Sequence, residues 1–319
     1  STTEGVGLNF GVSASDPDAT TPNLSAEGLP SGAAFTDNLD GTGTFSWTPG
    51  FTQSGVFNIT FIASDGSLAD SEVVAVTVGE AGNQLPELTS IGARSITEGA
   101  NLNFLITALD VDGPAPVLST GGLPTGAAFT DNGDGSGVFD WTPDFTQAGS
   151  FNVTFRATDD SIAVDSEVVN VTVFDAGNQA PELATIGSRS VTEGANLNFG
   201  VTATDPDGSN PSLNTSGLPT GATFTDNGNG TGSFNWDPDF TQSGSYLVIF
   251  RATDGLATDS ELVSISVTEA GNQAPTLAAI GARNTTEGVP LNFVVTANDP
   301  DGALPGLSAS PLPAGASFI

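Results

Sequence analysis

Residues 149–159 read Gly-Ser-Phe-Asn-Val-Thr-Phe-Arg-Ala-Thr-Asp, and their apolar side chains fall at every second position. A period of two is typical of a β-strand with one buried face and one face in water. Residues 101–108, Asn-Leu-Asn-Phe-Leu-Ile-Thr-Ala, largely follow the same pattern. A third alternating run carries Val164, Ser166, Val168, Val171 and Val173. These patterns predict three long strands that each turn the alternate residues toward a core.

Shorter strands are expected around these three. Residues 129–130 and 138–141 flank a run at 131–137, whose Asn-Gly and Asp-Gly steps supply the positive φ values of a hairpin turn. This run is similar to a calcium-binding EF-hand loop, but its ligand spacing differs and it has no distal Glu, so we interpret it as a turn. An opening strand is expected near 87–91, and a short strand near 116–119.

About seven strands in some 95 residues, with no helical period, predict a two-sheet β-sandwich with one core. Trp141 belongs to this core rather than to a sugar-stacking surface, because Phe139 precedes it by two residues on the same strand face.

The pattern is repeated along the chain. Thr-Glu-Gly recurs every 94 or 95 residues, at 3–5, 97–99, 192–194 and 286–288. This period suits independent domains. We expect an all-β array of tandem modules: 1–81, which lacks its opening strand; 82–176 and 177–270, both complete; and 271–319, the N-terminal part of a further module. Function is expected in the repeat and its junctions, because a solitary active site would occur once.

Both ends of the chain fall inside modules. Ser1 falls at the position of Ser95, and Ile319 aligns near Thr130. The simplest interpretation is a window from a longer repetitive protein. An alternative is assembly between chains, in which residues near 273–283 supply the opening strand that module one lacks.

The composition favours cations as partners. The 37 acidic residues against five basic ones give a formal charge of −32, which argues against nucleic acid and anionic membrane. The chain has no Cys and no His, so thiolate and imidazole metal sites are excluded. A solvated acidic surface of the halophilic type is the alternative explanation of the charge. The five Arg are expected to neutralise neighbouring acids.

The sequence contains neither a run of 18 apolar residues nor a charged-then-apolar leader, so no membrane contact is expected from it.

Three motifs carry a family resemblance: residues 122–127 (Gly-Leu-Pro-Thr-Gly-Ala), 138–143 (Val-Phe-Asp-Trp-Thr-Pro) and 149–159. They resemble the bacterial putative Ig and dystroglycan-type cadherin-like modules. This resemblance implies tandem Ig-like or cadherin-like β-sandwiches on secreted or cell-surface bacterial proteins. It also implies Ca²⁺ between successive domains, as in cadherin relatives.

The linker at 175–181 keeps the first acid and the final Pro of the cadherin pattern Asp-x-Asn-Asp-Asn-x-Pro, but Asn178 replaces its middle charge. The Asp-x-Asp of the pattern stands at 205–207 and the Ala-x-Asp at 252–254. Residues 144–147 retain only one acid of the cadherin Asp-Arg-Glu. The resemblance, with these losses, implies one or two ions at each junction.

Ca²⁺ takes six to eight oxygen ligands and accepts carboxylates together with amide and carbonyl oxygens. The ligands expected at the first junction are Glu4, Glu80, Asn83, Gln84, Asp110, Asp112 and Asp159. Those expected at the second are Glu98, Asp144, Asp175, Asn178, Gln179, Asp205, Asp207 and Asp254. Those expected at the third are Glu193, Asp239, Glu269, Asn272, Gln273, Asp299 and Asp301. The first site is expected to be weaker, because Gly50 stands where Asp144 stands in the next module.

The alternative is that these acids serve only as turn and linker residues. The leading hypothesis is a non-enzymatic extracellular structural array, such as a surface stalk, adhesin shaft or filament, stiffened by Ca²⁺ and able to contact neighbouring copies of itself in a fibre. The other functions considered are a glycan-binding or protein-binding adhesion module and a spacer attached to a secreted enzyme. Catalysis by this segment is not expected, because every acid singled out recurs in each module.

Overall fold

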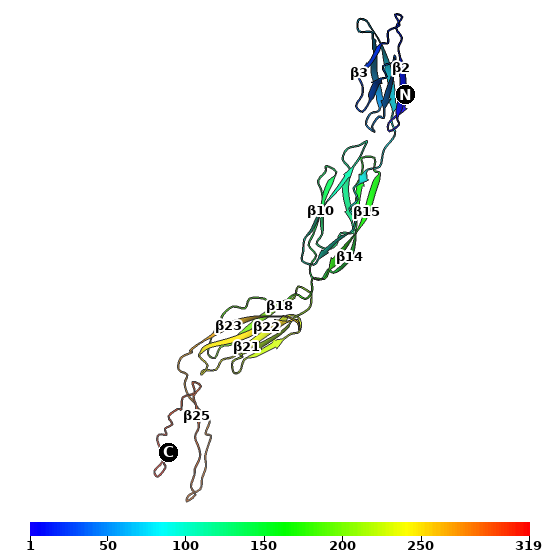
Figure 1. Ribbon diagram of the computed structural model, residues 1–319. Helices are drawn as coiled ribbons and strands as arrows, with labels where there is room; N and C mark the ends of the chain where they lie inside the picture. The colour runs from blue at the N-terminus through cyan, green and yellow to red at the C-terminus, as the bar shows by residue number, and fades with distance from the viewer. The chain divides into compact units, whose positions relative to one another are not determined.

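The computed structural model describes residues 1–319, and its regular elements are all β-strands (Figure 1). The chain divides into two compact units, Ser1–Pro143 with Gln147–Asp175, and Asp144–Thr146 with Ala176–Ile319. The predicted all-β architecture of repeated Ig-like units is confirmed.

Module two (residues 82–176) contains eight strands in two four-stranded sheets. One sheet has the order β12-β13-β10-β8 and is formed by β8 (Glu87–Leu88), β10 (Leu102–Leu109), β12 (Ala128–Asp131) and β13 (Ser136–Trp141). The other has the order β11-β14-β15-β9 and is formed by β9 (Arg94–Thr97), β11 (Val117–Gly121), β14 (Gly149–Thr158) and β15 (Val164–Phe174). All neighbours are antiparallel except β9 and β15, which run parallel.

Module three (residues 177–270) repeats this arrangement. Its sheets are β16-β18-β21-β20 and β17-β23-β22-β19. The strands are β16 (Glu182–Leu183), β17 (Arg189–Thr192), β18 (Leu197–Thr204), β19 (Ser212–Ser216), β20 (Thr223–Asp226), β21 (Thr231–Trp236), β22 (Gly244–Thr253) and β23 (Thr258–Thr268).

Module one (residues 1–81) has seven strands, in a four-stranded sheet β1-β7-β6-β3 and a three-stranded sheet β2-β5-β4. They are β1 (Thr2–Thr3), β2 (Leu8–Ser13), β3 (Asn23–Glu27), β4 (Ala34–Asp37), β5 (Thr42–Trp47), β6 (Gly55–Ser64) and β7 (Ala69–Gly79). The strand that corresponds to β8 and β16 is missing from its smaller sheet. In residues 271–319, β24 (Thr276–Leu277) pairs only with β25 (Ala297–Asn298).

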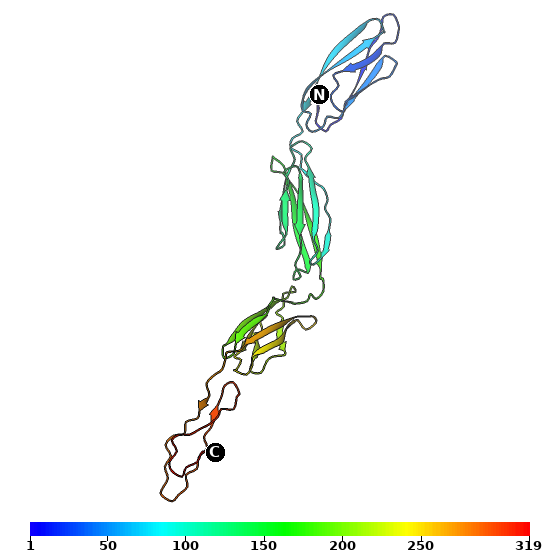
Figure 2. The ribbon, with the colours of Figure 1, turned by 90° about the vertical axis from the view of Figure 1, so that its left-hand side faces the viewer.

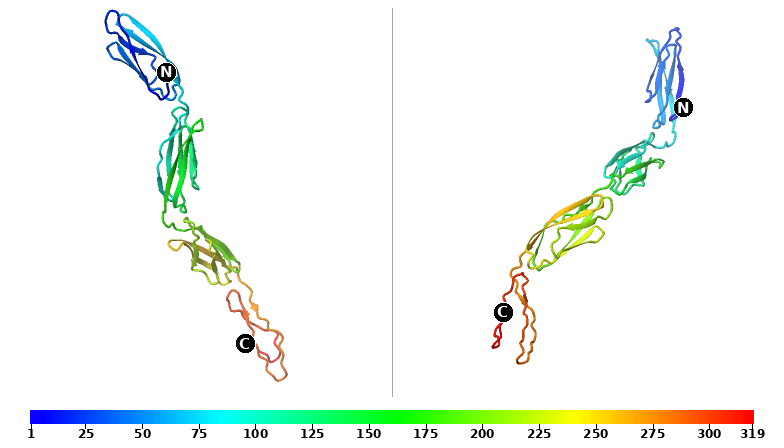
Figure 3. Two further views of the ribbon diagram at one scale, coloured as in Figure 1. Left: turned by 90° about the vertical axis from the view of Figure 1, so that its right-hand side faces the viewer. Right: turned by 60° about the horizontal axis from the view of Figure 1, so that its bottom comes forward.

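Each of the first three modules has its own core between its two sheets, and Figures 2 and 3 show these layers from other sides. Trp141 is fully buried, as predicted, and its ring meets Phe151 edge-on at a centroid distance of 5.0 Å. Its indole N–H donates to the carbonyl of Thr125 at 3.1 Å, so the polar end of the ring is satisfied inside the core. Trp47 and Trp236 repeat this arrangement in their modules.

The hairpin turn after β12 forms as its sequence predicts. Gly133 and Gly135 have φ values of 77° and 79°, which L-residues with a side chain rarely adopt. A Cβ on Gly135 would also lie 2.7 Å from the carbonyl oxygen of Ala108. Two separate constraints therefore select glycine at this position.

The burial expected for the first half of β15 is wrong. Val164 and Val168 are exposed, whereas Asp165 and Glu167 face inward and are half-buried. The reason is that these two carboxylates accept backbone hydrogen bonds from the segment around β8. Inward and outward side chains still alternate along β15, but the first inward side chains are acidic and only the later ones are apolar.

Arg94, Arg189 and Arg251 contact aromatic rings or a hydroxyl. The guanidinium of Arg94 lies 5.1 Å from the centre of the Phe104 ring, and that of Arg189 lies 5.0 Å from Phe199. Arg251 donates to the hydroxyl of Ser216 at 2.8 Å. That the five Arg neutralise neighbouring acids stays a prediction.

Candidate calcium-binding junctions

Module two contributes three acids to the first junction, and they lie where strands of both of its sheets end. Asp110 and Asp112 follow β10, and Asp159 follows β14. Asp110 and Asp159 are only 7% and 6% exposed, although both are acidic loop residues. Charged side chains are rarely buried to this extent without a partner, so their contacts decide what the site can do.

The linker before β8 is bound to these acids. The side-chain N–H of Asn83 donates to Asp159 Oδ2 at 2.8 Å, and the backbone N–H of Gln84 donates to Asp112 Oδ2 at 2.8 Å. The other Asp159 oxygen accepts the backbone N–H of Ala163 at 2.7 Å. The structure therefore brings five of the seven residues expected at this junction into one cluster.

Asp110 and Asp112 form a close acidic pair in this cluster. The backbone N–H of Asp112 donates to Asp110 Oδ1 at 3.2 Å. Asp110 Oδ2 and Asp112 Oδ1 are both buried and have no hydrogen-bond partner. A buried carboxylate oxygen without a donor costs free energy that a bound cation would remove.

The pKa values of the pair move in opposite directions. Burial, followed by the interaction with the side-chain carboxyl of Asp112 and the charges of Asp112 and Asp159, raises the pKa of Asp110, and the hydrogen bond from the backbone N–H of Asp112 only partly opposes this. The backbone N–H of Gln84, followed by the interaction with Asp110, lowers the pKa of Asp112. This is the behaviour of two carboxylates that share a site with too little positive charge.

The residues expected on module one are Glu4 and Glu80. Glu4 follows β1, is 2% exposed, and accepts the backbone N–H of Ala81 on Oε2 at 3.2 Å. Its Oε1 is buried and has no hydrogen-bond partner. Glu80, at the start of the linker, is exposed.

Module three repeats the linker contacts of module two. Asn178 donates to Asp254 Oδ2 at 2.8 Å, and the backbone N–H of Gln179 donates to Asp207 Oδ2 at 2.7 Å. The hydroxyl of Ser209 donates to Asp205 Oδ2 at 2.7 Å, so this oxygen has a donor that its counterpart on Asp110 lacks. The corresponding acids therefore occupy the same positions in the two modules, but they differ in how many of their carboxylate oxygens accept a hydrogen bond.

The remaining residues expected at the second junction are Glu98, Asp144 and Asp175. Glu98 is 6% exposed and follows β9, while Asp175 is exposed and follows β15. The hydroxyl and the backbone N–H of Thr146 bind Asp144 Oδ1 and lower the pKa of its carboxyl.

At the C-terminal end of module three, Glu193 is 3% exposed and accepts the backbone N–H of Ala270 on Oε2 at 3.3 Å. Its Oε1 is buried without a partner, as in Glu4. Asp239 binds Thr241 through Oδ1, which lowers the pKa of Asp239, and Glu269 accepts the hydroxyl of Ser243 at 3.1 Å.

The third linker makes fewer side-chain contacts. The backbone N–H of Gln273 donates to Asp301 Oδ2, the backbone N–H of Asp301 donates to Asp299 Oδ1 at 3.0 Å, and Asn272 donates to the carbonyl of Gln273 at 3.1 Å. Asp301 Oδ1 is buried without a partner.

Nowhere in the structure do three or more acidic side chains converge in the geometry of a metal centre. The orphaned oxygens of Glu4, Asp110 and Asp112 nevertheless fit a hard cation, because each is a buried acceptor that no protein donor reaches. Ca²⁺ also accepts amide and carbonyl oxygens, so a calcium site can form with fewer than three carboxylates.

The sequence did not indicate two features of these junctions. The backbone N–H groups of Ala81 and Ala270 bind Glu4 and Glu193, and a backbone donor leaves no signal in residue type. The difference between Pro114 and Ser209, which decides whether the acid four residues earlier has a hydroxyl donor, is visible in the sequence once the modules are aligned. No helix in this structure has the length and apolar character needed to cross a membrane.

Comparisons with known proteins agree with the fold. The Putative Ig domain family matches residues 1–79 and 86–174, and the Bacterial Ig domain family matches residues 178–266. Chitinase A of Pseudoalteromonas piscicida is 28% identical over 155 residues, which cover 49% of this chain and 19% of that protein. The match thus spans about a fifth of the curated relative.

Solved structures that this chain matches in part include an endo-fucoidan hydrolase of glycoside hydrolase family 107, at 17% identity, 83% of this chain, 42% of that chain and a TM-score of 0.34. They also include the human Desmocollin-1 ectodomain, at 14% identity, 87% of this chain, 61% of that chain and a TM-score of 0.38. Since the first family matches two successive modules that together make up more than half of the chain, the chain belongs to the Putative Ig domain family of Ig-like repeats.

Proposed function

We propose that this chain is a non-enzymatic extracellular structural array in which Ca²⁺ binds at the junctions between Ig-like modules and restricts their relative motion. The observation that carries this proposal is the set of buried, unpartnered carboxylate oxygens on Glu4, Asp110 and Asp112 beside one linker. The chain around them has 37 acidic residues and five basic ones, so a cation from solution is the natural source of compensating charge.

At the first junction the ion would be held by carboxylates and by the amide side chains of the linker. The residues concerned are Glu4, Glu80, Asn83, Gln84, Asp110, Asp112 and Asp159. A bound Ca²⁺ supplies positive charge to the acidic cluster. Asn83 and Gln84 already hold the linker against module two, so an additional ligand from module one would restrict the remaining freedom of the hinge.

An extracellular or cell-surface location suits this function. Calcium modules of the extracellular class bind at about 10⁻⁴ to 10⁻³ M, so their sites fill outside cells and stay empty at cytosolic concentrations. Membership in a family of bacterial Ig-like repeats supports the same location.

Thermal unfolding and small-angle scattering with and without Ca²⁺ test the proposal. With that affinity, 10 mM Ca²⁺ is 10 to 100 times the dissociation constant and stabilises the folded junction by about 1.4–2.7 kcal/mol. For a domain of this size, this corresponds to a rise of roughly 5–20 °C in Tm. The scattering profile should also show a narrower distribution of conformations in Ca²⁺ than in chelator.

Magnesium at the same concentration is the control for ionic strength, because Mg²⁺ requires a tighter octahedral site and binds such clusters less well. Identical melting and scattering in Ca²⁺, Mg²⁺ and chelator would refute calcium binding and favour the solvated acidic surface.

A second candidate function is a spacer joined to a secreted enzyme. The similarity to Chitinase A favours it, because residues of an Ig-like repeat chain match 19% of a protein whose name is that of a secreted type of hydrolase. On this hypothesis the 319-residue chain neither hydrolyses chitin nor sediments with it. A parent protein containing a hydrolase domain would support the hypothesis, and a parent made of repeats alone would contradict it.

A further inference from the structure

The loops after β10 and β18 carry the same acidic pair, Asp110 with Asp112 in module two and Asp205 with Asp207 in module three. In both pairs the backbone N–H of the second Asp donates to Oδ1 of the first, at 3.2 Å in module two and 2.9 Å in module three. In both, Oδ2 of the second Asp accepts a backbone N–H from the linker. We call each pair, together with the aspartate that binds the linker Asn, a half-site. The half-sites are Asp110, Asp112 and Asp159 in module two, and Asp205, Asp207 and Asp254 in module three.

The two half-sites differ four residues after their first Asp, where module two has Pro114 and module three has Ser209. The Ser209 hydroxyl donates to Asp205 Oδ2 at 2.7 Å. Proline has neither a side-chain donor nor a backbone N–H, so Pro114 can give no hydrogen bond to Asp110. A threonine serves as well as a serine at this spacing, because the Thr20 hydroxyl of module one donates to Asp16 Oδ2.

The state of the carboxylate oxygens follows this difference. Asp110 is 7% exposed, and Asp110 Oδ2 and Asp112 Oδ1 are buried without a hydrogen-bond partner. Asp205 is half-buried, and neither Asp205 nor Asp207 has a buried oxygen without a partner. The half-site of module two therefore lacks positive charge at an oxygen whose counterpart in module three is bound by a hydroxyl.

Glycine keeps the space beside Asp110 Oδ2 unfilled. A Cβ on Gly113 would lie 2.8 Å from this oxygen, and the three atoms nearest to that Cβ position all belong to the Asp110 carboxyl group. A side chain at position 113 would press on the oxygen that has no donor. The unpartnered oxygen and the unfilled space beside it both suit a bound cation.

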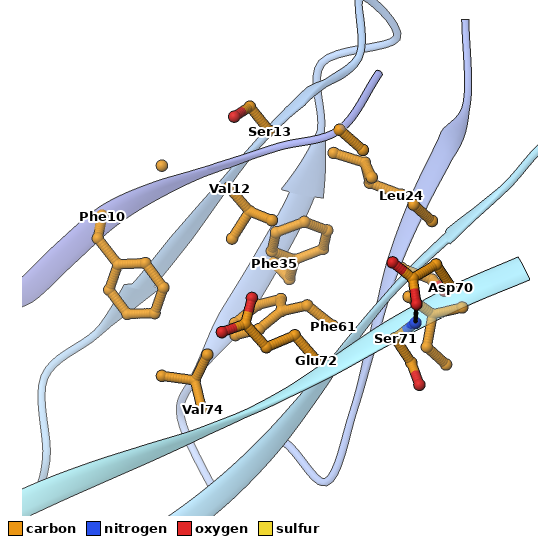
Figure 4. A pocket seen from close by; sticks show the side chains of 15 residues that line it. Phe10, Val12, Ser13, Leu24, Phe35, Phe61, Asp70, Ser71, Glu72 and Val74 are labelled. Atoms are coloured by element: carbon orange, nitrogen blue, oxygen red, sulfur yellow. Dashed lines mark hydrogen bonds between the residues drawn. The ribbon is translucent and has the colours of Figure 1, made fainter. Parts of the chain in front are cut away.

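The half-sites are separate from the apolar cavity of module one, which has a volume of about 410 Å³. Figure 4 shows the rings of Phe10, Phe35 and Phe61 around this cavity, with Asp70 and Glu72 projecting from β7. None of the residues expected at the calcium junctions lines it. Calcium binding is therefore not expected in the cavity, and the loops after β10 and β18 are the places to compare.

The difference between Gly50 and Asp144 is expected to matter less than the difference between Pro114 and Ser209. Asp144 is exposed, and its Oδ1 already accepts the hydroxyl and the backbone N–H of Thr146. An oxygen that accepts two hydrogen bonds has less negative charge to offer a cation. The lack of this carboxylate at Gly50 therefore removes a weak ligand.

We propose that the residue four positions after the first Asp sets the calcium affinity of each half-site, so that the first junction takes up Ca²⁺ before the second. This order of filling rests on the proposed function and adds a gradation to it. In module three the Ser209 hydroxyl already compensates Asp205 Oδ2, and an incoming cation competes with it for the same negative charge. In module two the cation meets no such competitor. Since one hydrogen bond to a charged group separates the two cases, we expect a roughly tenfold difference in dissociation constant.

The test is a Ca²⁺ titration of the intact 319-residue chain, followed by the NMR signals of the backbone N–H groups of Gln84 and Gln179. These groups donate to Asp112 and Asp207, so each signal reports on one half-site. We expect the Gln84 signal to reach its midpoint at a roughly tenfold lower Ca²⁺ concentration than the Gln179 signal.

Substitutions at the two positions isolate the effect from other differences between the junctions. Ser209→Ala should lower the Gln179 midpoint roughly tenfold and leave the Gln84 midpoint unchanged, because it removes the competing donor. Ser209→Thr keeps a hydroxyl and should keep the Gln179 midpoint. Ser212→Ala, at an exposed serine on β19 of the same module, is the matched control and should change neither midpoint. Pro114→Ser should raise the Gln84 midpoint, because it offers Asp110 a hydroxyl.

The same titration separates failure of the order of filling from failure of calcium binding. If neither signal responds to Ca²⁺ beyond its response to Mg²⁺, calcium binding is refuted and the order of filling falls with it. If both respond but Ser209→Ala shifts the Gln179 midpoint no more than Ser212→Ala does, calcium binding stands and the role of Ser209 is overturned. A Gln179 midpoint at or below that of Gln84 in the unaltered chain also overturns the proposed order.

Discussion

Asn83 donates its side-chain N–H to Asp159 Oδ2 at 2.8 Å, across 76 positions of the sequence. The bond joins the linker to the loop after β14, and Asn178 and Asp254 repeat it at 2.8 Å in the next module. In the cadherin pattern this Asn stands at a charged linker position. The substitution supplies a donor to a buried acid, so the linker is held in place even before a cation is considered.

Asn83→Ala should destabilise module two in chelator by about 1–2 kcal/mol, because it leaves an oxygen of the 6% exposed Asp159 without a donor. Amide hydrogen exchange of the segments around β14 and β15 measures the loss. Asn178→Ala is the matched control. It should have a smaller effect, because Asp254 is only half-buried and water can replace the lost donor. Equal losses in the two variants would argue against burial as the cause.

Asp110→Asn should have opposite effects in the two calcium conditions. In chelator it removes a buried charge whose Oδ2 has no partner, so module two becomes more stable. In 10 mM Ca²⁺ it removes a ligand, so the calcium-induced rise in Tm shrinks or disappears. Asp205→Asn is the control for the chelator result. It should not stabilise module three, because both oxygens of Asp205 already have donors. Calcium stabilisation that survives Asp110→Asn would remove Asp110 from the site.

The gain in stability of module two that Asp110→Asn produces in chelator should depend on pH. Because the pKa of Asp110 is raised in the folded protein, the folded state binds this proton more tightly than the unfolded state does. The contribution of Asp110 to stability therefore rises as the pH falls through the range between its ordinary and its raised pKa. The variant should be more stable than the unaltered chain at pH 7, and the difference should vanish in acid.

Urea unfolding of both proteins at several pH values between 3 and 7 measures this difference. The pKa of Asp112 is lowered, so its own contribution is lost as the pH falls, but both proteins keep Asp112 and its effect largely cancels. A difference that stays constant with pH would show that Asp110 does not titrate in this range.

Glu167→Ala should cost module two about 2–4 kcal/mol, because the backbone N–H groups of Ile91 and Gly92 lose their shared acceptor. Glu72→Ala removes the corresponding, exposed side chain of module one, and in the 319-residue chain it should change stability by less than about 0.5 kcal/mol. The two substitutions are chemically identical. Chemical denaturation combined with hydrogen exchange measures the loss of stability in each module separately. A large loss in Glu72→Ala would mean that this acid has a structural partner in module one.

Alternation in the sequence predicts β10 and β14 well, because each of these strands has one apolar face against the core. It fails for the first half of β15, where Asp165 and Glu167 face inward. Their burial is stabilised by backbone N–H groups more than 70 residues away, and a backbone donor has no residue-type signature. A window of neighbouring residues cannot reveal such a partner.

The sequence itself determined the repeat, the β-sandwich modules and the positions of the acids along the chain near each linker, because periodicity and turn chemistry are local properties. Only the tertiary structure decided which of the acidic side chains find hydrogen-bond donors. Asp110 Oδ2 and Glu4 Oε1 are left without donors, whereas both oxygens of Asp205 have one. The physical reason is that hydrogen-bond satisfaction depends on which donors reach a buried oxygen through space, and folding brings these donors together from distant parts of the chain.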